Sequence, residues 1–364
     1  MRHPLHAICP YFAMFPESFV AEQLLAYSRP DDLVYDPFCG RGTTILEGLL
    51  NDRDVIGSDV NLVAACVAGA KAEVPELSTV LRRVDELQST FHDLGDKDLP
   101  ESDFFAACYH PKTFSEISYL RSNLQWQENP VDRFIAATML GVLHGESHRS
   151  EMCLSNRMPR TISTKPDYSV RWWASRDLVA PERDTFAILR QSLGFRYSMK
   201  PPVRTGKVRL ADSRTASTIF HEEKGRVSLV VTSPPYLDTT DYAEDQWLRL
   251  WFLGQGIRPQ TRQNKDDRHT SIENYWTFLS EVWGGMEGLL AEKSTVVIRI
   301  GGTRLEKTAL MDGLFSGISQ AMPNRKVVAI HDGKSSIIAK RQTNSFRPGT
   351  SPDKMEHDFA FSIQ

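Results

Sequence analysis

The fold is decided by residues 33–44, which read LVYDPFCGRGTT. The apolar run 33–35 predicts a buried strand, and residues 42–50 after it predict a helix. Glycines at such a strand-to-helix turn permit positive φ and let a ligand approach the backbone closely. In an open α/β sheet this turn lies at the carboxyl end of a strand, where ligands bind. The stretch therefore predicts an α/β domain with a ligand-binding turn at residues 36–44.

Further apolar, β-branched runs predict the rest of the sheet. Buried parallel strands are expected at 55–57, 208–210, 227–231 and 295–300, and later strands at 326–330, 336–339 and 358–363. Helices are expected between the strands, for example at 17–28, 42–50 and 275–290. This alternation predicts a Rossmann-like, mostly parallel sheet with helices on both faces.

One long segment interrupts the alternation. Residues 62–205 are predicted to be mainly helical and to form an insertion, whereas 1–61 and 206–364 together form the sheet domain. The insertion is a candidate target-recognition region. No internal repeat or low-complexity tract accompanies it.

The bulk composition is that of an ordinary globular protein. The chain has 364 residues, 41% hydrophobic and 24% charged, with a formal net charge of −3. This charge argues against a surface that attracts nucleic acid everywhere, but it allows a local basic groove. No segment reaches the roughly 20 apolar residues that cross a membrane, and no secretory signal begins the sequence, so a cytoplasmic location is expected. Five separated cysteines predict buried thiols and no metal site.

The turn at 36–44 favours a particular class of ligand. Its spacing is neither that of a dinucleotide fold nor that of a phosphate loop, and Asp36 at the strand end disfavours a polyphosphate but suits an amino-acid-like cation. The run Asp36-Pro37-Phe38-Cys39-Gly40-Arg41-Gly42-Thr43-Thr44 resembles the first motif of S-adenosylmethionine-dependent amino-methyltransferases, which have a class I Rossmann-like fold. The resemblance implies that Asp36 and the Gly40–Gly42 turn, with Phe38, Thr43 and Thr44, hold the methionine end of S-adenosylmethionine.

Other segments extend this resemblance. Asp59, at the end of the second strand, is placed to accept hydrogen bonds from ribose hydroxyls. Asp212 resembles the acidic residue that receives the adenine amino group, and Tyr11, Met14 and Phe15 resemble the family's N-terminal motif beside the methionine moiety. Each aspartate alone has a structural alternative as a helix N-cap or turn residue. Three of them at successive strand ends favour the cofactor.

The fourth strand leads directly into Thr232-Ser233-Pro234-Pro235-Tyr236. The structural alternative for this run is a rigid proline turn, since prolines cannot donate to a strand ladder. The run resembles the catalytic motif of DNA amino-methyltransferases, in which serine preceded by threonine is typical of enzymes that make N4-methylcytosine. The resemblance implies that Thr232 lines the cofactor site and that the next four residues are catalytic.

The chemistry of an exocyclic amine explains these residue types. The lone pair of the amine is delocalised into the base, so hydrogen-bond acceptors aimed at its hydrogens help to localise it. We expect Ser233 Oγ and the Pro234 carbonyl to be these acceptors, and we expect Tyr236 to stack on the base after it is flipped out of double-stranded DNA. Carbon-5 methylation of cytosine is disfavoured because the chain has no Pro-Cys dipeptide.

Two basic segments are candidates for contacts with DNA. The first, 149–177, contains Arg157, Arg160 and Lys165, and the second, 254–271, contains Arg258 and Arg262. Solvated surface is an equal alternative for both. The pair Trp172-Trp173 in the first segment favours a packing anchor over a base wedge.

These observations leave several functions to compare. The leading one is a site-specific DNA methyltransferase that makes N4-methylcytosine, either solitary or paired with a cognate restriction endonuclease. Adenine-N6 methylation is the nearest alternative, followed by guanine-N2 methylation of RNA, which is less favoured because Asp36 leaves little room before it for the usual RNA-binding domain. A non-enzymatic nucleic-acid-binding protein with the same fold is a further alternative. The recognition sequence and the oligomeric state stay open.

Overall fold

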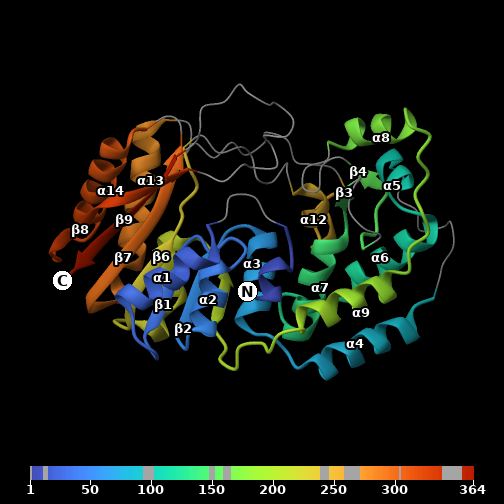
Figure 1. Cartoon of the computed structure of the whole chain (residues 1–364), viewed down its shortest axis with the longest axis horizontal. Helices are drawn as coiled ribbons and strands as arrows, with labels where there is room; N and C mark the ends of the chain where they lie inside the picture. Colours follow the sequence, from blue (N-terminus) through green and yellow to red (C-terminus); the bar gives the residue numbers. More distant parts are fainter. Residues whose placement is uncertain are drawn as a thin grey trace.

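The computed structural model describes residues 2–10, 15–92, 102–146, 152–158, 165–237, 246–257, 271–302, 305–337 and 355–364. A sheet part and a helical part lie side by side, with the N-terminal segment between them (Figure 1). The expected α/β class is confirmed, because the sheet carries helices on both of its faces.

The sheet part is built on seven strands in the order β5-β2-β1-β6-β7-β9-β8. Their bounds are β1 Leu33–Asp36, β2 Asp54–Asp59, β5 Lys207–Leu210, β6 Val227–Thr232, β7 Leu290–Gly302, β8 Val327–Ile337 and β9 Met355–Ile363. Strands β5, β2, β1, β6 and β7 are parallel, whereas β9 runs antiparallel to both β7 and β8. The sheet is therefore mostly parallel, as expected.

Alternation along the strands creates two apolar faces. Val34, Val231 and Val297 point to one face and pack with α1 and α2. Tyr35 and Val230 belong to the opposite face, which packs with α13 and α14. The helices of the sheet part are α1 Glu17–Tyr27, α2 Thr43–Leu50, α3 Leu62–Ala72, α10 Ala216–Ile219, α13 Ile272–Met286 and α14 Lys307–Ala321, with short 3-10 turns η1 Pro4–Ala7, η3 Ser213–Thr215, η4 His221–Glu223 and η6 Glu287–Leu289.

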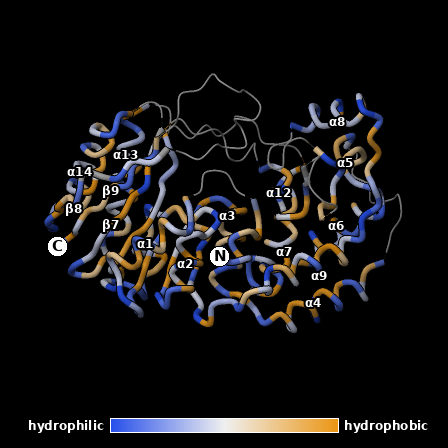
Figure 2. Tube along the Cα trace, viewed as in Figure 1, coloured by the Kyte–Doolittle hydropathy of each residue, from blue (hydrophilic) through white to orange (hydrophobic). Residues whose placement is uncertain are grey.

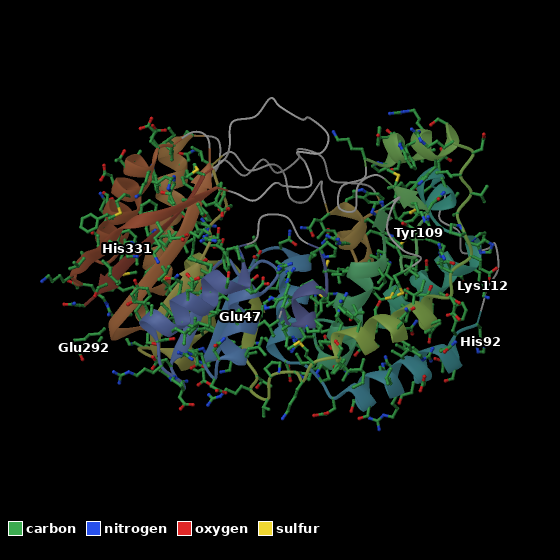
Figure 3. The ribbon with its side chains drawn as sticks, in the orientation of Figure 1. Glu47, His92, Tyr109, Lys112, Glu292 and His331 are labelled. Atoms are coloured by element: carbon green, nitrogen blue, oxygen red, sulfur yellow. The ribbon has the colours of Figure 1, made fainter. Side chains whose placement is uncertain are left out.

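The helical part has its own core, which continues from α3 through α7. Val80, Val84 and Leu87 are buried at helical spacing on α4, where Figure 2 shows hydrophobic residues alternating with hydrophilic ones. Tyr109 is a fully buried member of this core, and Figure 3 places it within the helical part. The elements are α4 Leu77–Thr90, α5 Asp103–Cys108, α6 Pro111–Asn123, α7 Pro130–Val142, α8 Pro166–Ala174, α9 Thr185–Arg196 and α12 Trp247–Phe252, with the short strands β3 Gly145–Glu146 and β4 Arg157–Met158.

The chain returns from the helical part next to the point where it left the sheet. The N–H of Gly206, just before β5, donates a 2.7 Å hydrogen bond to the carbonyl of Ala72, the last residue of α3. A Cβ at position 206 would lie 2.3 Å from Val55 Cγ2. Glycine therefore lets the returning chain lie directly against β2.

Three expectations about these elements were wrong. The run 208–210 is not buried, because β5 is the edge strand and Leu210 is 44% exposed. The runs 326–330 and 336–339 do not form two strands: β8 continues through the polar residues between them, with register irregularities that absorb the break. The helix expected at 275–290 ends at Met286, since Leu290 already begins β7.

The expectation about the cysteines is confirmed. All five cysteines are buried free thiols. Within the described ranges, no helix combines the length and apolar composition that a membrane span requires. Across the same ranges, no group of three or more His, Cys, Asp or Glu side chains is arranged to hold a metal ion.

Candidate active site

The turn after β1 combines two backbone requirements that only glycine meets easily. Gly40 and Gly42 both have positive φ, 49° and 73°. A Cβ on Gly42 would also lie 2.8 Å from Ala68 Cα, because α3 packs directly on the turn. α2 then starts at Thr43. The predicted ligand-binding turn is thus held tightly between β1 and two helices.

Asp36 lies at the centre of this site and is fully buried. Its Oδ1 accepts hydrogen bonds from Thr232 Oγ1 at 2.6 Å and from the Phe38 N–H at 3.1 Å. Its Oδ2 is buried and has no hydrogen-bond partner among the described residues. Burial raises the pKa of the Asp36 carboxyl to about 6. A cationic group beside Oδ2 would offset this cost of burial.

Asp59 connects the second strand to the same turn. Its Oδ2 accepts a 2.9 Å hydrogen bond from the Gly40 N–H, and its Oδ1 accepts one of 2.9 Å from the Asn61 N–H. Burial raises the pKa of the Asp59 carboxyl above its usual value. Asn61 in turn caps α3 by accepting from the Val63 N–H at 2.8 Å. Asp59 therefore fixes the turn through hydrogen bonds to the backbone on both sides.

The third predicted aspartate, Asp212, already has a strong partner. Its Oδ2 forms a 2.7 Å ion pair with Arg214, and its Oδ1 accepts from the Arg214 N–H at 3.0 Å. Arg214 also contacts Glu281 on α13 at 3.1 Å. The hydrogen bonds to Asp212 and Glu281 raise the pKa of Arg214 above its usual value. Asp212 thus has the capping role that the structural alternative describes, with its side chain still 30% exposed.

Hydroxyl groups that the sequence did not single out join the strand ends. Tyr35 and Ser58 share a 2.8 Å hydrogen bond, and Ser58 and Ser213 share one of 3.0 Å. Ser213 also donates to the Pro37 carbonyl. This chain of hydroxyls fixes the ends of β1, β2 and β5 relative to one another. Only the strand register brings these residues together, so no local sequence signal could have identified them.

A buried lysine on α3 contacts the backbone of the turn after β1. Lys71 on α3 is fully buried and its Nζ donates a 2.5 Å hydrogen bond to the Arg41 carbonyl. Burial lowers the pKa of Lys71 well below its usual value. Nearby, His6 Nε2 lies 2.6 Å from Glu47 Oε1, and Figure 3 shows Glu47 on α2 in the middle of the molecule. These contacts tie the N-terminal segment and α3 to the helix that follows the turn.

The predicted catalytic run begins where β6 ends. Thr232 is fully buried as the last residue of β6, and its neighbour Ser233 is half-buried. The Pro235 carbonyl accepts a 2.9 Å hydrogen bond from the Tyr275 hydroxyl of α13. Tyr236 is 9% exposed and its hydroxyl donates to Glu356 Oε1 at 2.8 Å. Because Thr232 also binds Asp36, this run lies next to the turn after β1.

The remaining predicted residues are placed only in part. Phe15 is buried and packs edge-on against Phe19, with ring centroids 5.5 Å apart, and Phe38 packs against Phe278 at 5.9 Å. Thr44 Oγ1 donates to the Val231 carbonyl at 3.2 Å. Five predicted residues, Tyr11, Met14, Arg160, Arg258 and Arg262, lie outside the described residues.

The two neighbouring tryptophans of the first basic segment, Trp172 and Trp173, lie in different environments. Trp173 is buried beside Phe104, and its Nε1 donates to the Arg157 carbonyl at 2.8 Å, so it is the packing anchor. Trp172 is half-buried under the guanidinium of Arg176, 4.4 Å from the ring centroid. Lys165 is exposed at the start of α8, which lies at the far upper end of the helical part (Figure 1).

The strand order and the turn after β1 define the class of the sheet part, a Rossmann-like α/β fold. Residues 3–67, which contain the turn, match the family described as DNA methylase. This matched segment ends within α3 and includes both Asp36 and Asp59.

Two curated relatives align with short segments of the chain. The orphan methyltransferase M.BamHII of Bacillus amyloliquefaciens is 41% identical over 49 residues, which is 14% of this chain and 18% of that protein. The type II methyltransferase M.MvaI of Kocuria varians is 33% identical over 61 residues, or 17% of this chain and 13% of that protein. The chain therefore aligns with less than a fifth of the length of either relative.

Similar solved structures are distant. The rRNA methyltransferase aviRa of Streptomyces viridochromogenes is 13% identical, with a TM-score of 0.35, over 100% of this chain and 90% of that chain. A geranyl diphosphate methyltransferase in complex with GPP and sinefungin is 10% identical, with a TM-score of 0.33, over 95% of this chain and 77% of that chain. Similarity at this level carries no argument about function.

Proposed function

We propose that this chain is an S-adenosylmethionine-dependent DNA methyltransferase that acts on the N4 amino group of cytosine. The observation that carries the proposal is the 2.6 Å hydrogen bond between Thr232 Oγ1 and Asp36 Oδ1. It joins the ends of adjacent parallel strands β1 and β6, one leading into the cofactor motif and the other into the catalytic motif. Methyl donor and acceptor must lie within reach of each other for direct transfer, and this contact brings their two motifs together.

The residues of the turn fit S-adenosylmethionine. The buried Oδ2 of Asp36 suits the cationic methionine end, and the Gly40–Gly42 turn allows close approach of a ligand to the backbone. Asp59 is half-buried at the end of β2, where it can accept from ribose hydroxyls. Asp212 shares its carboxylate between Arg214 and the adenine amino group. Bound S-adenosylmethionine supplies an electrophilic methyl group.

The residues of the catalytic run help the target amine to act as a nucleophile. Ser233 Oγ and the Pro234 carbonyl accept its hydrogens, so the nitrogen lone pair is held away from the ring. Pro235 keeps the run rigid because its φ is fixed. Tyr236 presents its ring to the flipped base, and stacking of this kind contributes roughly 1–3 kcal/mol per base.

DNA recognition is assigned to residues 62–205, most of which belong to the helical part, and to the second basic segment. Arg157, Arg160 and Lys165 in the first segment, and Arg258 and Arg262 in the second, contact phosphates of double-stranded DNA. Charge reversal at Arg157 and Arg160 is expected to weaken binding and reduce its salt dependence. Unchanged affinity and salt slope would remove this assignment. A cognate restriction endonuclease is the expected partner if the enzyme acts in a restriction-modification system.

The test of function is transfer of a tritiated methyl group from S-adenosylmethionine to unmethylated genomic DNA, followed by mass spectrometry of the nucleosides. Ser233→Ala is the diagnostic variant, because it removes the proposed acceptor. Ser228→Ala is its matched control, since Ser228 lies on the strand that precedes Ser233, and its hydroxyl donates a 3.4 Å hydrogen bond to the Leu33 carbonyl.

Each product assigns a different function. N4-methyldeoxycytidine that is lost in Ser233→Ala but retained in Ser228→Ala supports the proposal. N6-methyldeoxyadenosine would mean that the same site acts on adenine instead of cytosine. The matched family, whose model is named for both N6 and N4 methylation, allows this outcome. Label in RNA alone overturns the choice of DNA. Cofactor binding without transfer to any nucleic acid identifies a binding protein that has lost catalysis.

A further inference from the structure

We infer that Glu356 on β9 is a positioning residue that holds the ring of Tyr236 in the orientation needed to stack on the target base. This inference rests on the proposed function. The Tyr236 hydroxyl donates a 2.8 Å hydrogen bond to Glu356 Oε1. A carboxylate acceptor makes this bond stronger than one between neutral groups. Glu356 is more than a hundred residues from the catalytic run in the sequence.

The catalytic run is held from two different elements. Tyr275 on α13 donates to the Pro235 carbonyl at 2.9 Å, and Glu356 on β9 receives the hydroxyl of the next residue. One bond fixes the backbone before Tyr236, and the other fixes the far end of its side chain. With both ends fixed, the ring has little freedom to rotate, and it is 9% exposed.

Glu356 is itself held rigidly by the sheet. β9 lies between β7 and β8, and Glu356 is opposite Gly301 on one side and Ser336 on the other. A Cβ at position 301 would lie 3.2 Å from Glu356 Cγ and 2.3 Å from the Met355 carbonyl oxygen. Glycine at this position therefore leaves the space in which the Glu356 side chain starts.

A buried ion pair lies next to Glu356 on the same face of β9. Asp358, two residues along the strand, binds Arg299 through both oxygens at 2.6 and 2.7 Å, and Arg299 lies over the Phe19 ring at 3.8 Å. Burial lowers the pKa of Arg299, but the hydrogen bond to Asp358 and the charges of Asp358 and Glu356 outweigh it and raise that pKa above its usual value.

The test compares kcat and KM among variants of the full chain. Glu356→Ala leaves the ring without its acceptor and is expected to lower kcat about ten- to hundredfold, because small errors in orientation are costly to the rate. The KM for S-adenosylmethionine should change less than about twofold, since the cofactor residues are untouched. Glu356→Gln retains an oxygen acceptor and should restore kcat to within about threefold of the wild type. Glu292→Ala, at the amino-terminal end of β7 (labelled in Figure 3), is the matched control and should behave as wild type.

A double-mutant cycle tests whether Glu356 acts through Tyr236. Tyr236→Phe should lose as much kcat as Glu356→Ala, and the double variant should lose no more than either single variant. Unaltered kcat in a folded Glu356→Ala protein overturns the inference, as do losses that multiply in the double variant. If Glu356→Ala does not fold, a Glu356→Gln protein with kcat as low as that of Tyr236→Phe overturns it equally.

A second readout separates failure of this inference from failure of the proposed function. The four proteins of the cycle (the wild type, Glu356→Ala, Tyr236→Phe and the double variant) are unfolded in urea. The losses in free energy of unfolding caused by the two substitutions should again be non-additive. A wild-type protein that transfers no methyl group to DNA overturns the proposed function and the positioning role together, while the urea cycle still reports the contact. Transfer by the wild type together with additive stability losses overturns the inference alone.

Discussion

The hydroxyl of Thr232 donates a 2.6 Å hydrogen bond to the carboxylate of Asp36, so the last residue of β6 completes the environment of the last residue of β1. Both residues are fully buried. The bond supplies one of the two donors on Oδ1, the other being the Phe38 N–H. Whatever binds at Asp36 therefore lies beside the start of the Ser233-Pro234-Pro235-Tyr236 run.

Replacement of Thr232 by valine removes this donor with little change in shape. We expect the free energy of unfolding at pH 8 to fall by about 1–3 kcal/mol, because a buried carboxylate loses a partner. Affinity for S-adenosylmethionine should fall as well. Urea denaturation and titration calorimetry measure the two effects. Thr232→Ser keeps the hydroxyl and should retain most of the stability and most of the affinity. Equal losses in the serine and valine variants would contradict a role for the hydrogen bond and would point to the methyl group instead.

Cofactor binding should depend on pH through Asp36. Burial raises the pKa of Asp36 to about 6 in the free protein, and a bound cation favours the ionised form. Binding below pH 6 must therefore release a proton, and affinity should fall by about tenfold per pH unit there and level off above it. Calorimetry between pH 5 and 8 measures this. Asp36→Asn should bind weakly and lose the dependence; a wild-type profile that is flat through pH 6 contradicts the assignment.

In the free protein, the raised pKa of Asp36 makes the free energy of unfolding fall as the pH rises, whereas cofactor affinity rises with pH. The folded pKa of Asp36 is raised above its usual value of 3.8, so the neutral carboxyl favours the folded state. This contribution is fully present below about pH 4 and is lost as the pH rises through about 6. Comparison of unfolding midpoints for the wild type and Asp36→Asn isolates it. The gap between the two proteins should widen with rising pH in favour of the asparagine variant.

Gly42→Ala tests the close packing of the turn. The substitution places a Cβ at a φ of 73° and 2.8 Å from Ala68 Cα. Gly225→Ala is the matched control, because its φ of 70° is similar but nothing lies within 4 Å of the added carbon. We expect Gly225→Ala to cost about 1–2 kcal/mol from the backbone conformation alone. Gly42→Ala should cost more and abolish cofactor binding. Equal stability losses in urea would refute the packing argument.

The two neighbouring tryptophans of α8 should behave differently. Trp173 is 1% exposed, so Trp173→Ala should lower the free energy of unfolding by about 3–5 kcal/mol. Trp172→Ala removes a half-buried ring under Arg176 and should cost about 1 kcal/mol. Denaturant titration of the two variants tests the difference. Similar losses would mean that Trp172 shares the anchoring role.

Most of the sheet and the glycine turn after β1 could be predicted from local sequence. Apolar runs identify the strands, and the Gly40–Gly42 spacing identifies the turn, because both depend on neighbouring residues. Strand β5 was predicted to be buried because Val208 and Leu210 are apolar, but its edge position exposes Leu210 and leaves Val208 only half-buried. Position within a sheet is a property of the tertiary fold, which a short run does not encode.

The supporting residues of the site escaped prediction for the same reason. Ser58 and Ser213 are far apart in the chain, and Glu356 lies in a strand that is last in the sequence but next to last in the sheet. Their roles depend on strand register, which the spacing of residues in the sequence does not predict. The partner of Asp212 was also missed, although Arg214 is only two residues away, because ion pairing depends on side-chain direction in the 3-10 turn.

The hydrogen bond between Gly206 and Ala72 has a consequence for how such proteins diversify. It places the two ends of the intervening helical segment side by side, so the segment can be shortened, lengthened or exchanged while the strand order stays the same. Replacement of this segment by another helical segment whose ends lie equally close together should therefore leave the fold of the sheet part unchanged. The geometry of one glycine at the junction lets the helical segment vary without rebuilding the sheet.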